Sequence, residues 1–503
     1  MTYQDTSLEE WEVLDLLTSL VDKSLVVYEE DEHGGGRYRL LETVRQYARD
    51  KLLESHQSES VRRRHQGYFL NWTLARGQET ASLELGLKQK VWYEHFEEEH
   101  DNLRAALDWC LADTRLDDAV EEETLFRFCL GLHGFWWWRS HISEGYQYLC
   151  EALSSKPAAN PTLWRARVLS CAAGLAHSLG DLEAVHVLQE EALLIAAEVG
   201  DQDTLASAYN RLGAAAFHEC DFAIATSYLE QALGLDLELG RYSEASGSTA
   251  VLAAVSLRQG DFAAAKVQSE EALRLARTSG QLHNEAFAEI VCGHVAHYRE
   301  QYVAACTCFN RALNLLHESG VRVWEPWALE GLGRVALSQQ DEASARRYLE
   351  QAVELCRVSH QPGVEARCLI ALSYVALRQQ EHDQAKRLLN GALGLLQGSG
   401  MKWEIVCALE ATATIDARLE QWAAATCLYG AAEAQRSRMG ATASLTLWTD
   451  GANDMSSIHN ALDSATFAAA WQAGEAMTLE QAVAYALRQN KVHDNKVHEN
   501  RML

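Results

Sequence analysis

The amino-acid sequence predicts an all-α fold: a solenoid of about eight stacked helical pairs, preceded by a small module with one β-hairpin. Three observations support this prediction. The chain has 4 prolines in 503 residues, whereas average usage of about 5% would give about 25, and proline interrupts helix interiors. Hydrophobic residues make up 48% of the chain, which is ordinary for a globular protein. Finally, the sequence repeats itself every 40 residues.

The repeat is clearest between residues 211–240 and 251–280, which align without a gap. Alanine recurs in register at Ala152, Ala192, Ala232, Ala272, Ala312, Ala352, Ala392 and Ala432. A mainly acidic column reads Asp181, Asp221, Asp261, Gln301, Asp341, Glu381 and Gln421, and a glycine column reads Gly200, Gly240, Gly280, Gly320, Gly400 and Gly440, with His360 as the exception. Alanine lets helices approach closely, the acidic residue suits the start of the second helix of each pair, and a left-handed glycine suits its end.

The first 56 residues follow a different pattern. SLEEWEVLDLLTSLV has apolar residues at helical spacing. SLVVYEE and RYRL then read as two short strands around the hairpin tip DEHGGG, and LETVRQYARDKLLES reads as a second helix. Helix, hairpin and helix in this order are the later part of a winged-helix module.

Several strings resemble known families. Gly260-Asp261-Phe262, followed by Ala265 and Ala272-Leu273, resembles the tetratricopeptide repeat, and the 40-residue unit is similar to the repeats of MalT-like bacterial regulators. LLTSLVDKSLVVYEE and RYRLLETVRQYARDKL resemble the winged helix of STAND-type signalling ATPases, and FEEEHDNLRAALDWCL resembles their helical linker. LYGAAEAQRSRMGA and FAAAWQAGEAMTLEQAVAYAL resemble the end of their repeat domain.

These resemblances imply a division of the chain into five parts. We expect a partial winged helix over 1–56, a helical linker over 57–125, the repeat superhelix over 126–440, a helical cap over 441–490 and a disordered tail over 491–503. The phosphate-binding string GxxxxGK[ST] does not occur. The chain therefore resembles the sensor half of a STAND-type signalling ATPase or LuxR-like transcriptional regulator without the ATPase domain. We expect no bound cofactor and no resident metal.

Charge and targeting signals exclude other classes of function. Lys plus Arg number 44 and Asp plus Glu number 71, giving a net charge of −27, which argues against nucleic-acid and anionic-membrane binding. The first residues do not read as a signal peptide and no apolar run approaches the length of a membrane span, so we expect neither. The 12 cysteines are scattered through helical patterns, as in a reduced, cytoplasmic protein. No nucleophile–base or zinc-protease string is present, so we expect no enzyme activity.

A DNA-binding regulator acting through the winged helix is the alternative. DNA-reading helices and wings carry Lys and Arg. Here the first helix is acidic and the wing reads EEDEH. These charges would repel phosphate, so we expect this module to contact a STAND nucleotide-binding domain, in cis or in trans.

The concave face of the repeats is the expected binding surface, because the first helix of each pair lines it in tetratricopeptide superhelices. The repeat register predicts a groove lined by Arg258, His294, Tyr298, Trp327, Arg334, Arg367, Tyr374, Arg378 and Arg418. Arginine donates planar, paired hydrogen bonds to carboxylate or phosphate, and tyrosine adds a rigid contact. The groove would hold a protein, an acidic peptide or an anionic effector. Alternatively, these side chains pair with acids on neighbouring helices.

Three other clusters point to structure rather than chemistry. Cys292, His294, His297, Cys306 and Cys308 have metal-like composition, but the repeat register places Cys292 and His297 in apolar columns. Trp136-Trp137-Trp138 reads as core and interface packing, because adjacent rings on a helix point in different directions. Glu97-Glu98-Glu99 reads as exposed helix surface.

Overall fold

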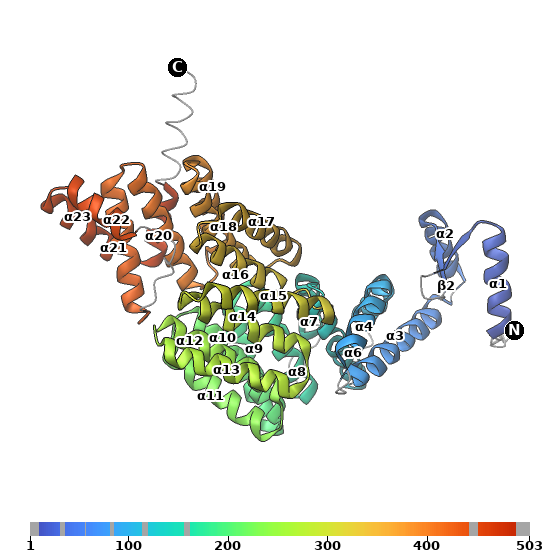
Figure 1. Ribbon diagram of the computed structural model, residues 1–503. Helices are drawn as coiled ribbons and strands as arrows, with labels where there is room; N and C mark the ends of the chain where they lie inside the picture. The colour runs from blue at the N-terminus through green and yellow to red at the C-terminus, as the bar shows by residue number, and fades with distance from the viewer. Residues whose placement is uncertain are drawn as a thin grey trace, which may run out of the picture. The chain divides into compact units, whose positions relative to one another are not determined.

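The computed structural model describes residues 10–30, 36–55, 57–80, 85–112, 119–154, 161–441 and 451–488. The tip of the predicted hairpin and the predicted disordered tail, 491–503, lie outside these described residues. The chain divides into two units, residues 1–71 with 103–110 and residues 72–102 with 111–503. The predicted all-α solenoid with one small hairpin is confirmed (Figure 1).

The first unit contains the predicted helix, hairpin and helix. Helix α1 (Glu10–Asp22) precedes strands β1 (Val26–Glu30) and β2 (Gly36–Leu40), which pair antiparallel, and helix α2 (Glu42–Glu54) follows. Tyr28 lies opposite Tyr38 in this ladder, with the ring centroids 5.1 Å apart. The unit continues into helix α3 (Ser58–Thr80) and includes most of helix α5 (His100–Ala112), whose Trp109 ring lies 5.1 Å from the Arg62 guanidinium.

Among its described residues, the second unit contains eight helical pairs, and helix α4 (Leu85–Glu98) comes before them. The pairs are α6 (Ala119–Trp138) and α7 (Ile142–Ser154), α8 (Leu163–Leu179) and α9 (Leu182–Val199), α10 (Gln202–His218) and α11 (Phe222–Glu238), α12 (Tyr242–Arg258) and α13 (Phe262–Ser279), α14 (Leu282–Tyr298) and α15 (Tyr302–Ser319), α16 (Glu325–Ser338) and α17 (Glu342–Ser359), α18 (Pro362–Arg378) and α19 (His382–Leu396), and α20 (Lys402–Arg418) and α21 (Trp422–Arg438). Helices α22 (Gly451–Ala461) and α23 (Ser464–Glu475), then helical residues 479–488, follow.

The repeat columns take the local roles that the sequence predicts. The carboxylates of Asp181, Asp221, Asp261 and Asp341 each accept a hydrogen bond from a backbone N–H in the first turn of the following helix. The glycine column has positive φ throughout, and His360 adopts the same left-handed conformation with a φ of 53°. The alanine column is buried and packs the paired helices together. Gln301, Glu381 and Gln421 of the same column make no such side-chain bond, so local sequence sets both ends of four of the eight second helices.

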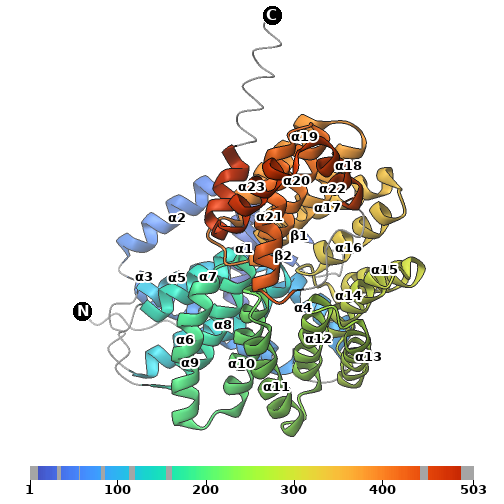
Figure 2. The ribbon, with the colours of Figure 1, turned by 90° about the vertical axis from the view of Figure 1, so that its left-hand side faces the viewer.

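The repeats wind round one another in a superhelix (Figure 2), and units distant in the sequence touch. Helix α8 contacts α18, and a β-carbon built on Gly180 would lie 3.4 Å from Met401 Cε. At a second place, the backbone N–H of Arg322 donates to the carbonyl of Trp138 over 2.8 Å. We call these two contact regions the seam. The inner face of the repeats lines a partly open cavity.

In the part of the chain that the structure describes, no helix combines the length and apolarity needed to cross a bilayer.

Candidate functional site: a cavity enclosed by the repeats

The cavity has a volume of about 530 Å³ and is lined mainly by the first helices of the pairs. A column of five residues spaced 40 apart follows its wall: Ser207, Gly247, Phe287, Trp327 and Arg367. The repeat geometry places these positions at equivalent points of α10, α12, α14, α16 and α18. The volume falls within the range of about 300–1,000 Å³ that is usual for small-molecule sites.

Aromatic rings make up much of the wall between α6 and α16. Trp138 lies 5.2 Å from Trp324 and 4.5 Å from His283, measured between ring centroids, and Phe287 stacks on Trp324 at 4.9 Å. Trp137 also lines the cavity, whereas Trp136 is buried against Tyr148. Trp136 therefore packs in the core, whereas Trp137 and Trp138 also form part of the cavity wall.

One end of the cavity collects polar groups from α6, α8 and α10: His133, Trp137, His177, Arg211 and His218. Burial, together with nearby arginines, lowers the pKa values of His133, His177 and His218 to about 3. These imidazoles are therefore neutral at physiological pH. Atoms of all five side chains are buried without a hydrogen-bond partner. Such orphaned groups are uncommon in native proteins and call for an explanation.

Most of the predicted groove residues lie around two buried carboxylates, Glu330 beside the cavity and Glu404 on its wall. Arg334 and Arg367 lie 3.4 Å and 3.7 Å from Glu330, and Arg258 lies 3.8 Å from Glu404. His294 is 3.9 Å from Glu330, and Arg334 donates to the Tyr298 hydroxyl over 3.3 Å. Of the nine predicted residues, Trp327 and Arg367 line the cavity itself.

The other three predicted residues contact the chain elsewhere. Tyr374 is buried in the core. Arg378 donates to the carbonyl of Leu337 over 2.8 Å. Arg418 pairs with Asp454 of α22 at 2.9 Å. The structure therefore brings six of the nine residues together around Glu330 and Glu404, and leaves these three apart.

Asp236 and Arg241 form a charged pair on the cavity wall, which sequence reasoning did not single out. Arg241 Nε lies 3.2 Å from Asp236 Oδ1, and Arg241 also donates to Asp203 over 2.8 Å. Burial raises the pKa of Asp236 to about 7 in spite of the neighbouring arginine. Asp236 is thus a carboxyl group that changes its charge near neutral pH inside the cavity.

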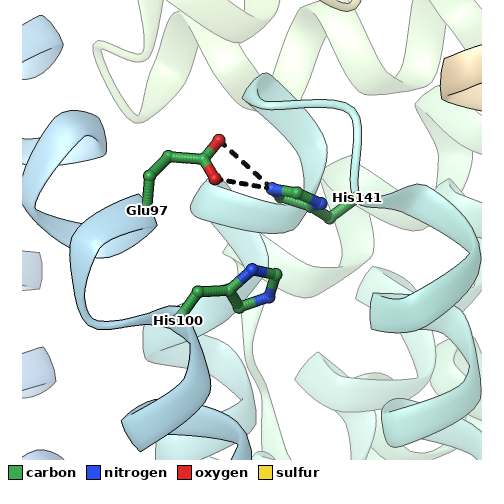
Figure 3. Close-up of side chains that lie close together, drawn as sticks. All are labelled: Glu97, His100 and His141. Atoms are coloured by element: carbon green, nitrogen blue, oxygen red, sulfur yellow. Dashed lines mark hydrogen bonds and ion pairs between the residues drawn. The ribbon is translucent and has the colours of Figure 1, made fainter. Parts of the chain in front are cut away.

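A separate cluster of Glu97, His100 and His141 has the composition of a metal site (Figure 3). One ligand atom from each residue lies within 4.8 Å of the others, and two imidazoles with a carboxylate suit Zn²⁺. However, His141 Nε2 lies 3.2 Å from both Glu97 oxygens, and Arg139 donates to Glu97 over 3.0 Å. Burial alone would raise the pKa of Glu97, but these hydrogen bonds outweigh it and lower the pKa to about 2. The cluster is therefore explained as an ion-pair network.

This network also corrects the interpretation of Glu97 as exposed helix surface. Its side chain is 30% exposed, and its partner Arg139 donates to the carbonyl of Gly320 at the seam over 3.2 Å. The 40-residue repeat could not predict this contact, because the repeat describes neighbouring units and this contact joins residues 181 positions apart.

Comparison with known proteins supports the two kinds of module. Residues 5–53 match the family model described as a winged helix-turn-helix domain, and residues 292–357 match a tetratricopeptide repeat. Proteins named as HTH-type transcriptional regulators from Mycobacterium tuberculosis and Mycobacterium bovis are 32% identical over 231 residues. The match covers 43% of this chain and 24% of each relative, so this chain spans about a quarter of their length.

One solved structure shares the fold at low sequence identity. A Rap protein crystallised with competence and sporulation factor superposes with a TM-score of 0.54 and 13% identity, covering 74% of this chain and 99% of that one. A STAND protein with a tetratricopeptide repeat sensor from Pyrococcus horikoshii gives a TM-score of 0.37 at 16% identity, over 72% of this chain and 55% of that one, too low to support an argument. Together these findings show that the chain is a tetratricopeptide repeat protein with an N-terminal winged helix.

Proposed function

We propose that this chain is the sensor portion of a bacterial signal-transduction or transcription regulator of the STAND type, and that an effector binds in the cavity enclosed by its repeats. The observation that carries the proposal is the cavity of about 530 Å³, with aromatic walls and orphaned polar groups. The relatives named as transcriptional regulators support the regulatory role. The role is one of binding rather than catalysis, in the cytoplasm, and a STAND nucleotide-binding domain is the proposed partner of the winged helix.

The proposed mechanism uses the seam. An effector that contacts α6, α10 and α16 together binds the closed array more tightly than an open one, because an open array separates these helices. Binding therefore shifts the population toward the closed form, by as much as the effector's affinities for the two forms differ. A change in closure would then alter the surface that the repeats present to a nucleotide-binding domain.

The experiment is a thermal-shift screen of small metabolites against the wild-type chain and Gly247→Trp. Gly247 lines the cavity, and a β-carbon built there meets no atom within 4 Å, so the tryptophan has room to fill the cavity. Gly234→Trp is the matched control, because Gly234 is also a helical glycine in open space but lies outside the cavity lining. We expect hits that stabilise the wild type and Gly234→Trp but not Gly247→Trp. Hits that stabilise all three proteins equally would place the binding site elsewhere.

The second candidate function is DNA binding through the winged helix, which the family match over residues 5–53 favours. In the hairpin, Arg39 pairs with Glu29 at 3.4 Å, which leaves less positive charge for phosphate. A mobility-shift titration with random duplex DNA at low salt distinguishes the candidates. Saturable binding that weakens as salt is raised would support the DNA-binding role.

A further inference from the structure

The end of the cavity between α6, α8 and α10 carries donors without acceptors. We propose that it binds the carboxylate of a small, singly charged ligand through Arg211, with an aromatic or apolar body of the ligand against the tryptophan wall. This inference rests on the proposed function, because it names the chemical class of effector that the cavity takes.

Arg211 is the central residue of this end. Its Nε atom is buried without a hydrogen-bond partner. Burial lowers the pKa of Arg211, and the electrostatic neighbour that acts on it is the Cys171 thiol rather than a carboxylate of the described residues. The guanidinium lies over the Trp137 ring, 5.4 Å from the centroid. It also occupies space that Gly174 leaves free, since a β-carbon on Gly174 would lie 2.3 Å from Arg211 Nη1. The chain thus makes room for a cation without supplying its counter-ion.

The neighbours of Arg211 add further unsatisfied groups. Trp137 Nε1, which can only donate, is buried without a partner, as are His133 Nε2 and His177 Nε2. The positive charge of Arg211 contributes to the low pKa values of both histidines, so it lies near them. A neutral imidazole can place its proton on the nitrogen that faces an acceptor. Arg211 is therefore the group on which the proposed carboxylate contact depends, and Trp137, His133 and His177 line the cavity beside it.

The other cavity arginines already have acidic neighbours. Arg241 pairs with Asp203 and Asp236, and Arg367 lies 3.7 Å from Glu330. Arg211 is therefore the cavity arginine that lacks a carboxylate neighbour among the described residues. A single uncompensated guanidinium matches a single negative charge, because a second charge would enter the cavity unpaired, at a high desolvation cost. This reasoning favours a carboxylate over a polyphosphate.

The remaining wall determines the body of the ligand. On the cavity wall, the Trp324 ring contacts both Trp138 and Phe287. Flat rings that remain accessible in a cavity favour an aromatic or broad apolar partner, since stacking adds to the burial of apolar surface. The cavity is therefore amphipathic, with hydrogen-bond donors at one end and aromatic rings beside it.

The test compares two fluorescent probes that differ in one anionic group: 1-anilinonaphthalene-8-sulfonate and its uncharged counterpart N-phenyl-1-naphthylamine. Both are titrated into the full chain, Arg211→Gln and the control Arg274→Gln, whose arginine lies on the outer helix α13 with its side chain 61% exposed. Because charge-assisted hydrogen bonds are strong, Arg211→Gln should weaken sulfonate binding by about tenfold or more and leave the neutral probe unchanged. Unchanged sulfonate affinity, or equal loss of both probes, would overturn the proposal.

A second measurement separates ligand binding from a structural role for Arg211. Arg211→Met removes an uncompensated buried cation but keeps the apolar bulk of the side chain. The melting temperature of the ligand-free variant should therefore be equal to that of the wild type or higher by about 1–4 °C. A markedly lower melting temperature would show that Arg211 stabilises the fold and would overturn the proposal. Gly247→Trp separates the two levels of inference. If it abolishes binding of both probes while Arg211→Gln changes neither, the cavity is a binding site but Arg211 is not its anion contact.

Discussion

Single side chains in this protein show how much a residue's role depends on partners far away in the chain. Arg211 falls in a repeat column that otherwise reads Cys171, Val251, Val291, Gly331, Ala371 and Ala411. A lone arginine in an apolar column is the one sequence signal that could have found it. Trp327 and Arg367 could be predicted, because they lie one or two helical turns before repeat positions that carry arginine, histidine and tyrosine. The lack of a counter-ion could not be predicted, since it depends on what α6 and α8 place around Arg211.

Asp236 should make stability depend on pH. Its pKa rises from 3.8 to about 7 on folding, mainly through burial. For an acid with a raised pKa, the folded state prefers the neutral form, so stability is highest below pH 4 and falls as pH rises toward 7. At about 1.4 kcal/mol per pKa unit, this shift should lower the free energy of unfolding by up to about 4 kcal/mol as the pH rises from 4 to above 7. Asp236→Asn should remove this decrease.

The measurement is urea unfolding of the wild type and Asp236→Asn at pH 5 and pH 8. Asp203→Asn is the control, because Asp203 pairs with the same Arg241 but its side chain is 54% exposed. We expect the variant to gain stability relative to the wild type as the pH rises. A parallel pH profile for Asp236→Asn and the wild type would contradict the prediction.

Glu97 should have the opposite pH dependence. Its pKa falls from 4.5 to about 2 on folding, because hydrogen bonds from His141 and Arg139 outweigh burial. A depressed pKa stabilises the fold above pH 4.5, and this contribution is lost as pH falls toward 2. Glu97→Gln should therefore cost about 1–3 kcal/mol at pH 7 and progressively less at acidic pH, because it leaves Arg139 without its carboxylate. Glu98→Gln is the adjacent control in the same denaturation series, and an equal loss in both variants would argue against the network.

Helices and turns were the most predictable level of this structure. The capping and glycine columns act within one helical turn, so their residue types reveal the local conformation directly. A second series of positive φ values recurs between the paired helices, for example at Cys220, Glu300 and Gln340. Sequence did not predict this series, because the residue type varies and only the backbone conformation repeats.

Packing between paired helices should be sensitive to size at the alanine column. Ala272 is fully buried between α12, α13 and α14. Ala272→Leu should overpack this crossing and cost about 1–3 kcal/mol. Hydrogen exchange should show the loss of protection centred on residues 251–320. Ala263→Leu, at an exposed position of the same helix, is the control, and equal effects of both substitutions would refute the packing argument.

At the scale of the whole second unit, sequence predicted the stacking of the repeats but not their closure. The repeat columns describe contacts between neighbouring units, and such contacts are enough to identify a solenoid. The seam instead joins Trp138 to Arg322 and Gly180 to the region of Met401. Small rotations between successive units accumulate over several repeats to bring these residues together. No single position of the repeat reveals this accumulated rotation, so the cavity could not be predicted.

The whole chain should not bind ATP by itself. The sequence lacks the phosphate-binding string GxxxxGK[ST], and the single uncompensated guanidinium in the cavity does not match a triphosphate. Titration of a fluorescent ATP analogue should show no saturable binding at micromolar concentrations. Unlabelled ATP should likewise leave the melting temperature unchanged. Saturable binding that Gly247→Trp abolishes would instead identify the cavity as a nucleotide site.

The seam has an evolutionary consequence. An open solenoid can gain or lose a unit by duplication or deletion, because each unit contacts only its neighbours. Here the distance between the two edges of the seam depends on how many units lie between them. Losing or adding 40 residues between α8 and α18 would move Gly180 away from Met401 and open the cavity. Repeat number in this lineage should therefore be inherited as strictly as strand number in a closed β-barrel, while the surface residues of each unit remain free to diverge.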